Sequence, residues 1–276
     1  MTHAGRFTSK SADGEASVAD SCGIAFMAKA SAPGRAKTRL VPPLTFEEAA
    51  ALNTAFLQDV ADNVLLAARH RPLHAHIAGY AAYGPPGSED FFHRTLPGAI
   101  GLIDAWQSNF GDCLLHTIRE ILARGHGSAV VLNSDSPTLP TALLLETAAV
   151  LARPGDRGVL GPSNDGGYYL LGLKAAHRRM FEDIAWSTER VAEQTLERAR
   201  EIGLEMHCLP LWYDVDDAGG LHRLHRELFG EDSSQRPDMH PPHYAAQTAQ
   251  LLSKLWRGGD FGGHSDRILQ VDEAHA

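Results

Sequence analysis

Short apolar runs alternate with amphipathic stretches along this chain. Residues 22–27 and 129–132 are short and continuously apolar, which is typical of strands that are buried on both faces. Further strands are predicted over residues 74–79, 99–103, 158–161, 168–173 and 205–213. Because strands and helices alternate, we expect a mostly parallel sheet in a layered α/β fold.

Helices are predicted where apolar residues recur every three or four positions. The clearest one begins at a capping box, in which the side chains of Thr45 and Glu48 each bond the other residue's backbone N–H. Its buried stripe consists of Ala49, Leu52, Phe56, Val60 and Val64. Other helices are predicted over residues 112–124, 141–152 and 188–202, and around Leu221, Leu224 and Leu228.

The length of 276 residues suits one domain with tails. Residues 1–21 are polar and lack the apolar run of a signal peptide, so we expect a disordered leader there. The alternating pattern occupies residues 22–230, and residues 231–276 are expected to be a polar linker and a C-terminal extension with a short helix over residues 244–256. No run reaches the ~20 apolar residues that span a membrane.

The overall charge restricts the partners. A net charge of -9 argues against nucleic-acid binding, which needs a broad basic surface. Cys22, Cys113 and Cys208 are sparse, odd in number and set in apolar segments. We therefore expect buried thiols in a protein of the reducing cytoplasm.

Residues 28–40, which we call the basic loop, follow the first predicted strand. Gly34 lets the backbone of this loop approach a ligand, and cations can neutralise phosphate oxygens. The four cations are Lys29, Arg35, Lys37 and Arg39. In an acidic protein such a local site suits a small phosphorylated ligand better than a polymer, although a solvated basic turn would have the same sequence.

Three acidic motifs also follow predicted strands. They contain Asp135, Asp165, and the pair Asp214 and Asp216. Ligands of open α/β sheets bind at the carboxyl ends of strands, where a carboxylate could hold a divalent cation that bridges diphosphate oxygens. Local structure offers an alternative for each motif: an Asx-turn at Asp135, an Asp-Gly hairpin turn at Asp165, and helix capping after residue 213.

The motifs and their order resemble the DUF2064 family, a glycosyltransferase-like branch of the nucleotide-diphospho-sugar transferases with the GT-A fold. The matching segments are Pro-Gly-Arg-Ala-Lys-Thr-Arg-Leu at 33–40, Ser-Asp-Ser-Pro-Thr-Leu-Pro at 134–140, Asp-Gly-Gly-Tyr-Tyr-Leu at 165–170, Trp-Ser-Thr at 186–188 and Asp-Val-Asp at 214–216. The resemblance runs from about residue 23 to residue 228. It implies a single-domain, three-layer sandwich with a mostly parallel central sheet.

The resemblance also implies roles for individual residues. Nucleotide binding falls on Ala28, Lys29, Gly34, Arg35, Lys37, Arg39 and Ser134. Mg²⁺ or Mn²⁺ falls on Asp135 and Asp216, with Asp214 as the alternative second ligand. The resemblance assigns catalysis to Asp165 and Asp135. It assigns substrate binding to Gly166, Gly167, Tyr168 and Trp186.

Two departures from the family pattern affect this assignment. Position 133 is Asn, so only one carboxylate of the DxD-type metal motif is present. The family commonly continues Asp-Val-Asp with Thr-Pro-Glu-Asp-Leu, whereas this chain has Asp-Ala-Gly-Gly-Leu at 217–221. The helix after Asp216 is therefore expected to start less firmly.

These observations predict a metal-dependent glycosyltransferase that moves a sugar from a nucleotide sugar to an acceptor. Three alternatives remain open. A nucleotidylyltransferase would release pyrophosphate from a nucleoside triphosphate, and a mutase or isomerase would rearrange the bound nucleotide sugar. A non-catalytic nucleotide-binding module also fits, because the metal motif has a single carboxylate.

Overall fold

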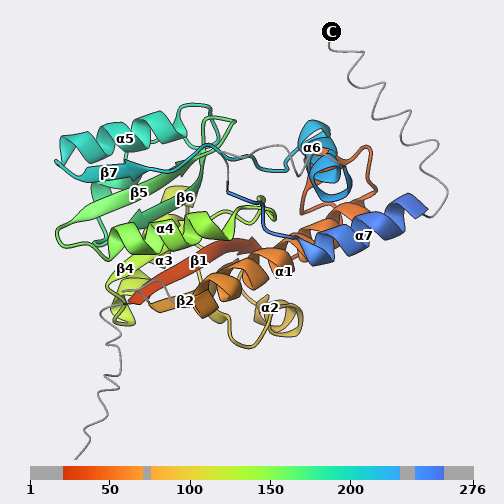
Figure 1. Cartoon of the computed structure of the whole chain (residues 1–276), viewed down its shortest axis with the longest axis horizontal. Coiled ribbons are helices and arrows are strands. Elements are labelled where there is room, and N and C mark those ends of the chain that lie inside the picture. The colour runs from red at the N-terminus through yellow and green to blue at the C-terminus, as the bar shows by residue number, and fades with distance from the viewer. Residues whose placement is uncertain (1–20, 71–75, 231–239, 258–276) are drawn as a thin grey trace, which may run out of the picture.

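The computed structural model describes residues 21–70, 76–230 and 240–257. The predicted leader, apart from Ser21, lies outside the described residues, and so do residues 74–75 of the second predicted strand and the predicted linker up to residue 239. A seven-stranded sheet lies between two layers of helices (Figure 1). Its strands are β1 (Ser21–Lys29), β2 (His76–Gly84), β3 (Gly101–Asp104), β4 (Ser128–Leu132), β5 (Arg157–Pro162), β6 (Tyr168–Leu173) and β7 (Glu205–Cys208).

The strand order is β3-β2-β1-β4-β6-β5-β7. β1 pairs in parallel with β2 and β4, β2 pairs in parallel with β3, and β5 pairs in parallel with β7. β6 is antiparallel to both of its neighbours, β4 and β5. The predicted α/β fold with a mostly parallel sheet is therefore confirmed, with one reversed strand that brings the Asp-Gly-Gly motif beside the end of β4.

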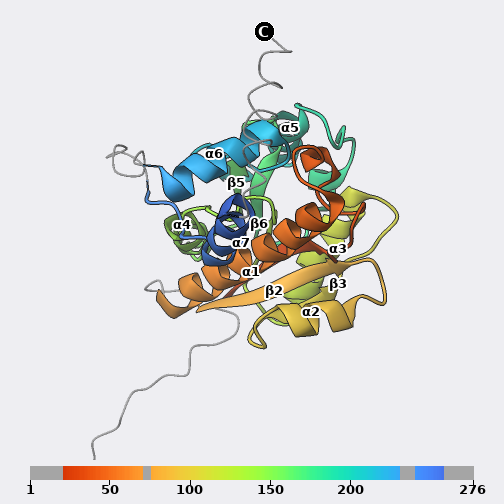
Figure 2. The same cartoon turned by 90° about the vertical axis from the view of Figure 1, so that its right-hand side faces the viewer.

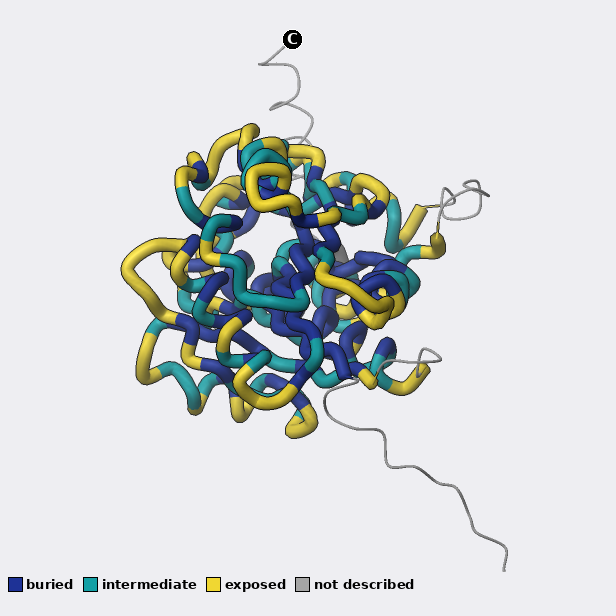
Figure 3. Tube along the Cα trace, turned by 90° about the vertical axis from the view of Figure 1, so that its left-hand side faces the viewer, coloured by how far each residue is buried: buried dark blue, intermediate teal, exposed yellow. Residues whose placement is uncertain are grey.

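Two apolar clusters cover the two faces of the sheet. The helices are α1 (Phe46–His70), α2 (Glu89–Thr95), α3 (Phe110–Ala123), α4 (Thr141–Leu151), α5 (Val191–Glu201), α6 (Ala218–Phe229) and α7 (Ala246–Arg257). Side chains of α1, α4, α6 and α7 join one cluster, and those of α3 and α5 join the other. The buried residues gather around the sheet, and the exposed ones follow the loops (Figure 3).

Helix α1 has the start that the sequence predicts. The backbone N–H of Thr45 donates to Glu48 Oε2 over 2.8 Å, and the backbone N–H of Glu48 donates to Thr45 Oγ1 over 3.2 Å. The five residues of the predicted stripe are all buried. This helix forms the support on which the first strand and the basic loop rest.

Several boundaries differ from the prediction. β2 continues to Gly84, because it pairs with β1 along the whole length of that strand. α5 begins at Val191, because the Thr188 hydroxyl donates to the carbonyl of Ala185 and forms a turn before the helix. The last strand ends at Cys208, since Pro210 lacks the N–H that a strand ladder needs. Helix α2 was not predicted.

The cysteines only partly follow the prediction of buried thiols. Cys22 is buried in β1, whereas Cys113 is half-buried and Cys208 is exposed. Cys208 is exposed because it lies at the end of β7, which pairs with a neighbour on one side only. The prediction is therefore wrong for Cys208.

Helix α7 of the C-terminal extension lies alongside α1 (Figures 1 and 2). Asp59 of α1 is buried and accepts the backbone N–H groups of Gln247, over 2.9 Å, and Thr248, over 2.8 Å. A carboxylate in this position caps the N-terminus of α7, and its negative charge interacts favourably with the positive end of the helix dipole.

Within the described residues, no helix combines the length and the apolar content needed to cross a bilayer.

Candidate functional site

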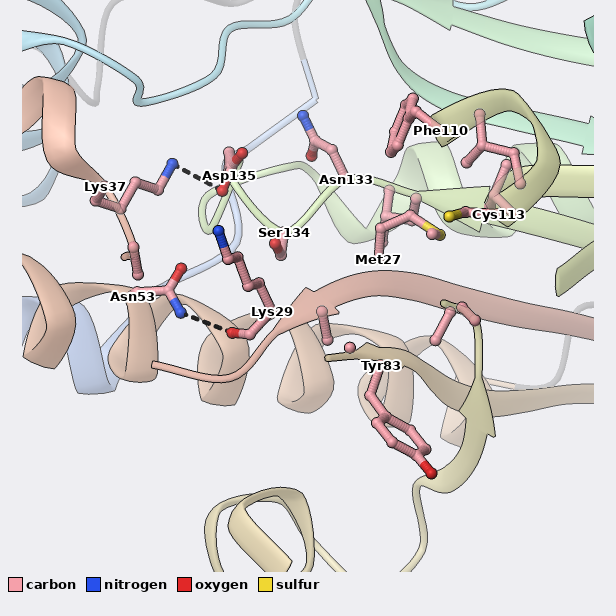
Figure 4. A pocket seen from close by; sticks show the side chains of 18 of the residues that line it. Met27, Lys29, Lys37, Asn53, Tyr83, Phe110, Cys113, Asn133, Ser134 and Asp135 are labelled. Carbon is pink, nitrogen blue, oxygen red and sulfur yellow. Dashed lines mark hydrogen bonds and ion pairs between the residues drawn. The ribbon is translucent and has the colours of Figure 1, made fainter. Parts of the chain in front are cut away.

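A pocket of about 520 Å³ lies where β1, β2 and β4 end. This is the edge at which open α/β sheets bind ligands. Charged side chains, among them Lys37 and Asp135, gather on one side of the pocket, and Met27, Phe110 and Cys113 lie on the other (Figure 4). The pocket thus joins an ionic end to an apolar end.

The structure brings together most, but not all, of the residues that the sequence singled out. The predicted residues that line the pocket are Ala28, Lys29, Arg35, Lys37, Arg39, Ser134, Asp135, Tyr168 and Asp216. Those outside its lining are Gly34, Asp165, Gly166, Gly167, Trp186 and Asp214. Gly34 has a φ of 71°, a turn conformation that favours glycine, and a Cβ built there would meet no atom of the described residues within 4 Å, so its role in nucleotide binding stays a prediction.

The cations of the basic loop differ in their surroundings. Lys29 and Arg35 are exposed, and within the described part of the chain no hydrogen bond or ion pair holds either side chain. Lys37 is the opposite, with a side chain that is 5% exposed. The two exposed cations can therefore bind an anion in the pocket without first breaking an ion pair.

The ammonium of Lys37 joins two of the predicted metal ligands. Its Nζ lies 2.7 Å from Asp135 Oδ1 and 2.9 Å from Asp216 Oδ1, and it donates to the carbonyl of Val215 over 2.7 Å. Burial alone would lower the pKa of Lys37, but the two carboxylates outweigh that effect and raise it. Lys37 is therefore charged at neutral pH, and Arg39 pairs with the same carboxylate of Asp216 from the exposed side.

Two hydrogen bonds to backbone carbonyls hold the two acidic segments together. The N–H of Val215 donates to the carbonyl of Asp135 over 2.8 Å, and the Ser136 hydroxyl donates to the carbonyl of Tyr213 over 2.8 Å. These bonds fix the segment after β4 against the segment before α6. As a result, the carboxylates of Asp135 and Asp216 face the same point.

The helix after Asp216 starts more firmly than predicted. Asp217 is its N-cap, and its Oδ1 accepts the backbone N–H of Gly220 over 2.8 Å. The side chain of Asp217 supplies the cap that the Thr-Pro-Glu-Asp pattern would otherwise provide. The expectation of a weak start was therefore wrong.

Asp165 closes its own turn. Its Oδ1 accepts the hydroxyl of Ser163, over 2.6 Å, and the backbone N–H of Gly167, over 2.9 Å. Gly166 has a φ of 85°, and a Cβ there would lie 2.0 Å from the carbonyl oxygen of Glu189. Local geometry thus requires glycine at position 166 and gives Asp165 a structural role in the turn, and the catalytic role of Asp165 stays a prediction.

Asp214 lies among several carboxylates. Burial raises its pKa to about 6, and the charges of Asp165, Asp216 and Asp135 add to that rise. A carboxyl group whose pKa is higher in the folded than in the unfolded protein stabilises the fold at pH values below its unfolded-state pKa. That contribution is lost as the pH rises through about 6.

We expect Asp214→Asn to remove this pH dependence. Relative to the wild type, the variant should gain about 1–2 kcal/mol in the free energy of unfolding between pH 4 and pH 7, because only the wild type pays for ionising this half-buried group. Chemical denaturation of both proteins across this pH range measures the difference. A difference that stays constant with pH would contradict the expectation.

Two residues of the pocket lining each have a buried polar side-chain atom without a hydrogen-bond partner within the described residues. The atoms are Oδ1 of Asn133 and the hydroxyl of Tyr168. Nearly all buried polar groups in proteins are hydrogen-bonded, so these two atoms are exceptions, as are four others among the described residues that lie outside the pocket lining. The sequence indicated Tyr168 but not Asn133, which it presented only as a missing carboxylate.

The apolar end of the pocket contains aromatic residues that sequence reasoning missed. Trp106 and Phe110 line the pocket and are 54% and 50% exposed. Trp186 packs edge-on against Phe110, with ring centroids 5.4 Å apart. Trp186 therefore supports the wall and is not part of the lining. No sequence signal distinguishes exposed aromatic residues of this kind from core residues.

Two carboxylates support the prediction of a divalent metal site. Asp135 and Asp216 converge on one point, but no group of three His, Cys, Asp or Glu side chains within the described ranges is placed to hold a metal ion. Mg²⁺ is usually bound by one or two carboxylates together with substrate phosphates and water. The donor set thus suits a hard divalent cation that arrives with a phosphorylated ligand.

The sheet order, the reversed β6 and the pocket at the strand ends define an α/β protein of the nucleotide-diphospho-sugar transferase type of fold. Residues 68–188 match the family described as "Uncharacterized protein conserved in bacteria (DUF2064)", which confirms the resemblance to that family. No curated protein matches the chain.

Solved structures extend the comparison over most of the chain. A candidate nucleotide-diphospho-sugar transferase from Desulfovibrio desulfuricans is 26% identical, with 84% of this chain and 94% of that chain covered and a TM-score of 0.69. A cytidylyltransferase from Leptospira borgpetersenii is 10% identical, with 86% and 94% covered and a TM-score of 0.47. A Mycobacterium tuberculosis protein in complex with manganese is 15% identical, with 74% and 97% covered and a TM-score of 0.40.

Proposed function

We propose that this protein is a glycosyltransferase that binds a nucleotide sugar in the pocket and transfers the sugar to an acceptor. The observation that carries the proposal is that Lys29 and Arg35, two exposed cations without a partner among the described residues, lie on the wall of a pocket at the carboxyl ends of the strands. Cations placed in this way can form charge-assisted hydrogen bonds with the oxygens of a diphosphate. The fold shared with the Desulfovibrio protein supports the same class of ligand.

The unpaired polar atoms support a sugar beside the diphosphate. Oδ1 of Asn133 can accept a hydrogen bond from a sugar hydroxyl, and the Tyr168 hydroxyl can donate or accept one. Both residues line the same pocket as Lys29 and Arg35. A ligand with several hydroxyl groups next to its phosphates would satisfy all four side chains.

A divalent cation, Mg²⁺ or Mn²⁺, fits between Asp135 and Asp216, because both present hard oxygen donors to one point. When bound there, it would supply positive charge that stabilises the departing nucleoside diphosphate. The chain's own residues orient the donor: Lys29 and Arg35 hold the phosphates, and Asn133 and Tyr168 hold the sugar. Asp165, which lies outside the lining and whose charge acts on Asp214, is our candidate for the acid–base group.

A panel of nucleotide sugars and nucleoside triphosphates, with products separated by chromatography, tests the reaction class. We expect slow, metal-dependent release of a nucleoside diphosphate from at least one nucleotide sugar, because water replaces an absent acceptor. Tyr168→Phe should lower that turnover about tenfold, the value of one hydrogen bond, and should leave the affinity for the free nucleoside diphosphate unchanged. The matched control is Tyr244→Phe, which removes an exposed hydroxyl outside the pocket.

Other products would lead to other conclusions. Pyrophosphate released from a nucleoside triphosphate, with no diphosphate from any sugar donor, would establish nucleotidyl transfer instead. Rearrangement of a nucleotide sugar without release of either product would establish a mutase or isomerase. Binding without any turnover would leave a nucleotide-binding module.

A further inference from the structure

Lys37 is built into the centre of the site in an unusual way. Its three ammonium N–H groups have three acceptors, Asp135 Oδ1, Asp216 Oδ1 and the carbonyl of Val215, all within 2.9 Å. An ammonium group has three donors, so none is left for a phosphate in this arrangement. In this arrangement Lys37 differs from Lys29 and Arg35, whose side chains have no partner among the described residues.

The backbone of Lys37 is held in a conformation that a residue with a side chain rarely adopts. Its φ is 51° and its ψ is 38°, in the left-handed region, directly before the 3₁₀ turn Thr38–Leu40. The ring of Phe56 lies 5.3 Å from Nζ and supports the ammonium from α1. Strained residues of this kind persist where the surrounding contacts fix their conformation, and they concentrate at functional and switching sites.

We propose that Lys37 is a resident counter-ion, which competes with the divalent cation for Asp135 and Asp216 and must leave these carboxylates when the cation binds. This inference rests on the proposed function, because that function assigns a divalent cation to Asp135 and Asp216. It adds a regulatory step to the site: the protein neutralises these carboxylates with its own Lys37 side chain. A bound divalent cation then replaces that contact.

The competition follows from space and charge. A divalent cation shared by these two oxygens would lie about 2.0–2.6 Å from each, within the volume that Nζ occupies. The two positive charges would also repel each other strongly in a partly buried site. Lys37 already lines the pocket, so an ammonium that leaves the carboxylates faces the space that the phosphates would enter. Arg39 is exposed and can keep its contact with Asp216 from outside.

Calorimetric titration of the nucleotide-free protein with Mn²⁺ tests the proposal. We expect Lys37→Met to bind Mn²⁺ at least about tenfold more tightly than the wild type, because the carboxylates lose the competing charge. Lys29→Met is the matched control, since it removes the same charge from the same pocket and Lys29 forms no ion pair with Asp135 or Asp216. The control should have the Mn²⁺ affinity of the wild type.

Equal Mn²⁺ affinity of Lys37→Met and the wild type would overturn the proposal, and so would equal gains in both lysine variants. Lys37→Gln, which keeps an N–H donor for the carboxylates, replaces Lys37→Met if that variant does not fold. Chemical acetylation of the wild type gives a second measurement: saturating Mn²⁺ should expose Lys37 to the reagent, and unchanged protection would contradict displacement. These titrations contain no nucleotide, so their failure is independent of the reaction class.

Discussion

The double variant Lys29→Ala/Arg35→Ala is expected to lose about 10²- to 10⁴-fold in affinity for a nucleoside diphosphate. A hydrogen bond to a charged group contributes roughly 1.5–3 kcal/mol, and every ~1.4 kcal/mol changes affinity about tenfold. The fold should be retained, because both side chains are exposed and no bond within the described residues holds them. Calorimetric titration measures the affinity, and thermal unfolding checks the fold.

A change of net charge could by itself weaken the binding of an anion. The double variant Arg94→Ala/Lys254→Ala removes the same charge from exposed positions on α2 and α7, outside the pocket. It should bind nearly as well as the wild type, because exposed charges farther than about 10 Å are largely screened at 0.1 M salt. If the two double variants lose affinity equally, then the pocket cations are only solvated charges of a turn.

Much of the ionic end of the pocket follows from the sequence, because it depends on a simple rule. Parallel strands end at the same edge of the sheet, so loops after different strands meet there even when they are distant in the chain. Lys37 and Asp216 illustrate this, with Nζ and Oδ1 only 2.9 Å apart in space. The pairing itself could not be predicted, since a pattern of charges does not tell which cation will be buried against which carboxylate.

Asp165 illustrates the limit of motifs. An Asp-Gly-Gly sequence is consistent with both a ligand-binding loop and a tight turn, and only the positions of Ser163 and Glu189 show why the turn needs these residues. Both neighbours depend on strand pairing and on the start of α5. The structure accounts for the turn, while a catalytic role rests on the proximity of Asp165 to Asp214.

The long elements were predictable and the short ones were not. The stripe of α1 repeats over many turns, so its period is clear from sequence alone. Helix α2 has seven residues and one fully buried side chain, Phe92, which is too little for a recognisable period. The extension of β2 depends on its neighbour β1, and the exposure of Trp106 depends on the whole fold. Neither is a local property.

Helix α7 was predicted as a helix, but its place in the fold was not. Its attachment depends on Asp59, a buried carboxylate in the middle of α1. Carboxylates are almost never fully buried unless they are paired or hydrogen-bonded, and Asp59 satisfies this condition with two backbone N–H groups of α7. Burial raises the pKa of Asp59, and the hydrogen bonds from residues 247 and 248 partly oppose that rise.

Asp59→Ala is expected to lower the free energy of unfolding by about 2–4 kcal/mol. Two hydrogen bonds to a charged acceptor contribute roughly 1.5–3 kcal/mol each, and relief of the burial cost of the carboxylate offsets part of the loss. The variant also leaves two N–H groups at the start of α7 without their acceptor. Denaturant unfolding measures the loss, and amide hydrogen exchange should show that α7 loses protection before α1 does.

The neighbouring carboxylate provides the control. Asp62 lies one turn further along α1 but is exposed, so Asp62→Ala should change the free energy of unfolding by no more than about 0.5 kcal/mol. Asp59→Asn keeps an acceptor without the charge and should fall between the two variants, because a neutral hydrogen bond contributes about half as much. If Asp59→Ala and Asp62→Ala have the same stability, the carboxylate does not hold α7, and apolar packing through Leu252 must provide the attachment.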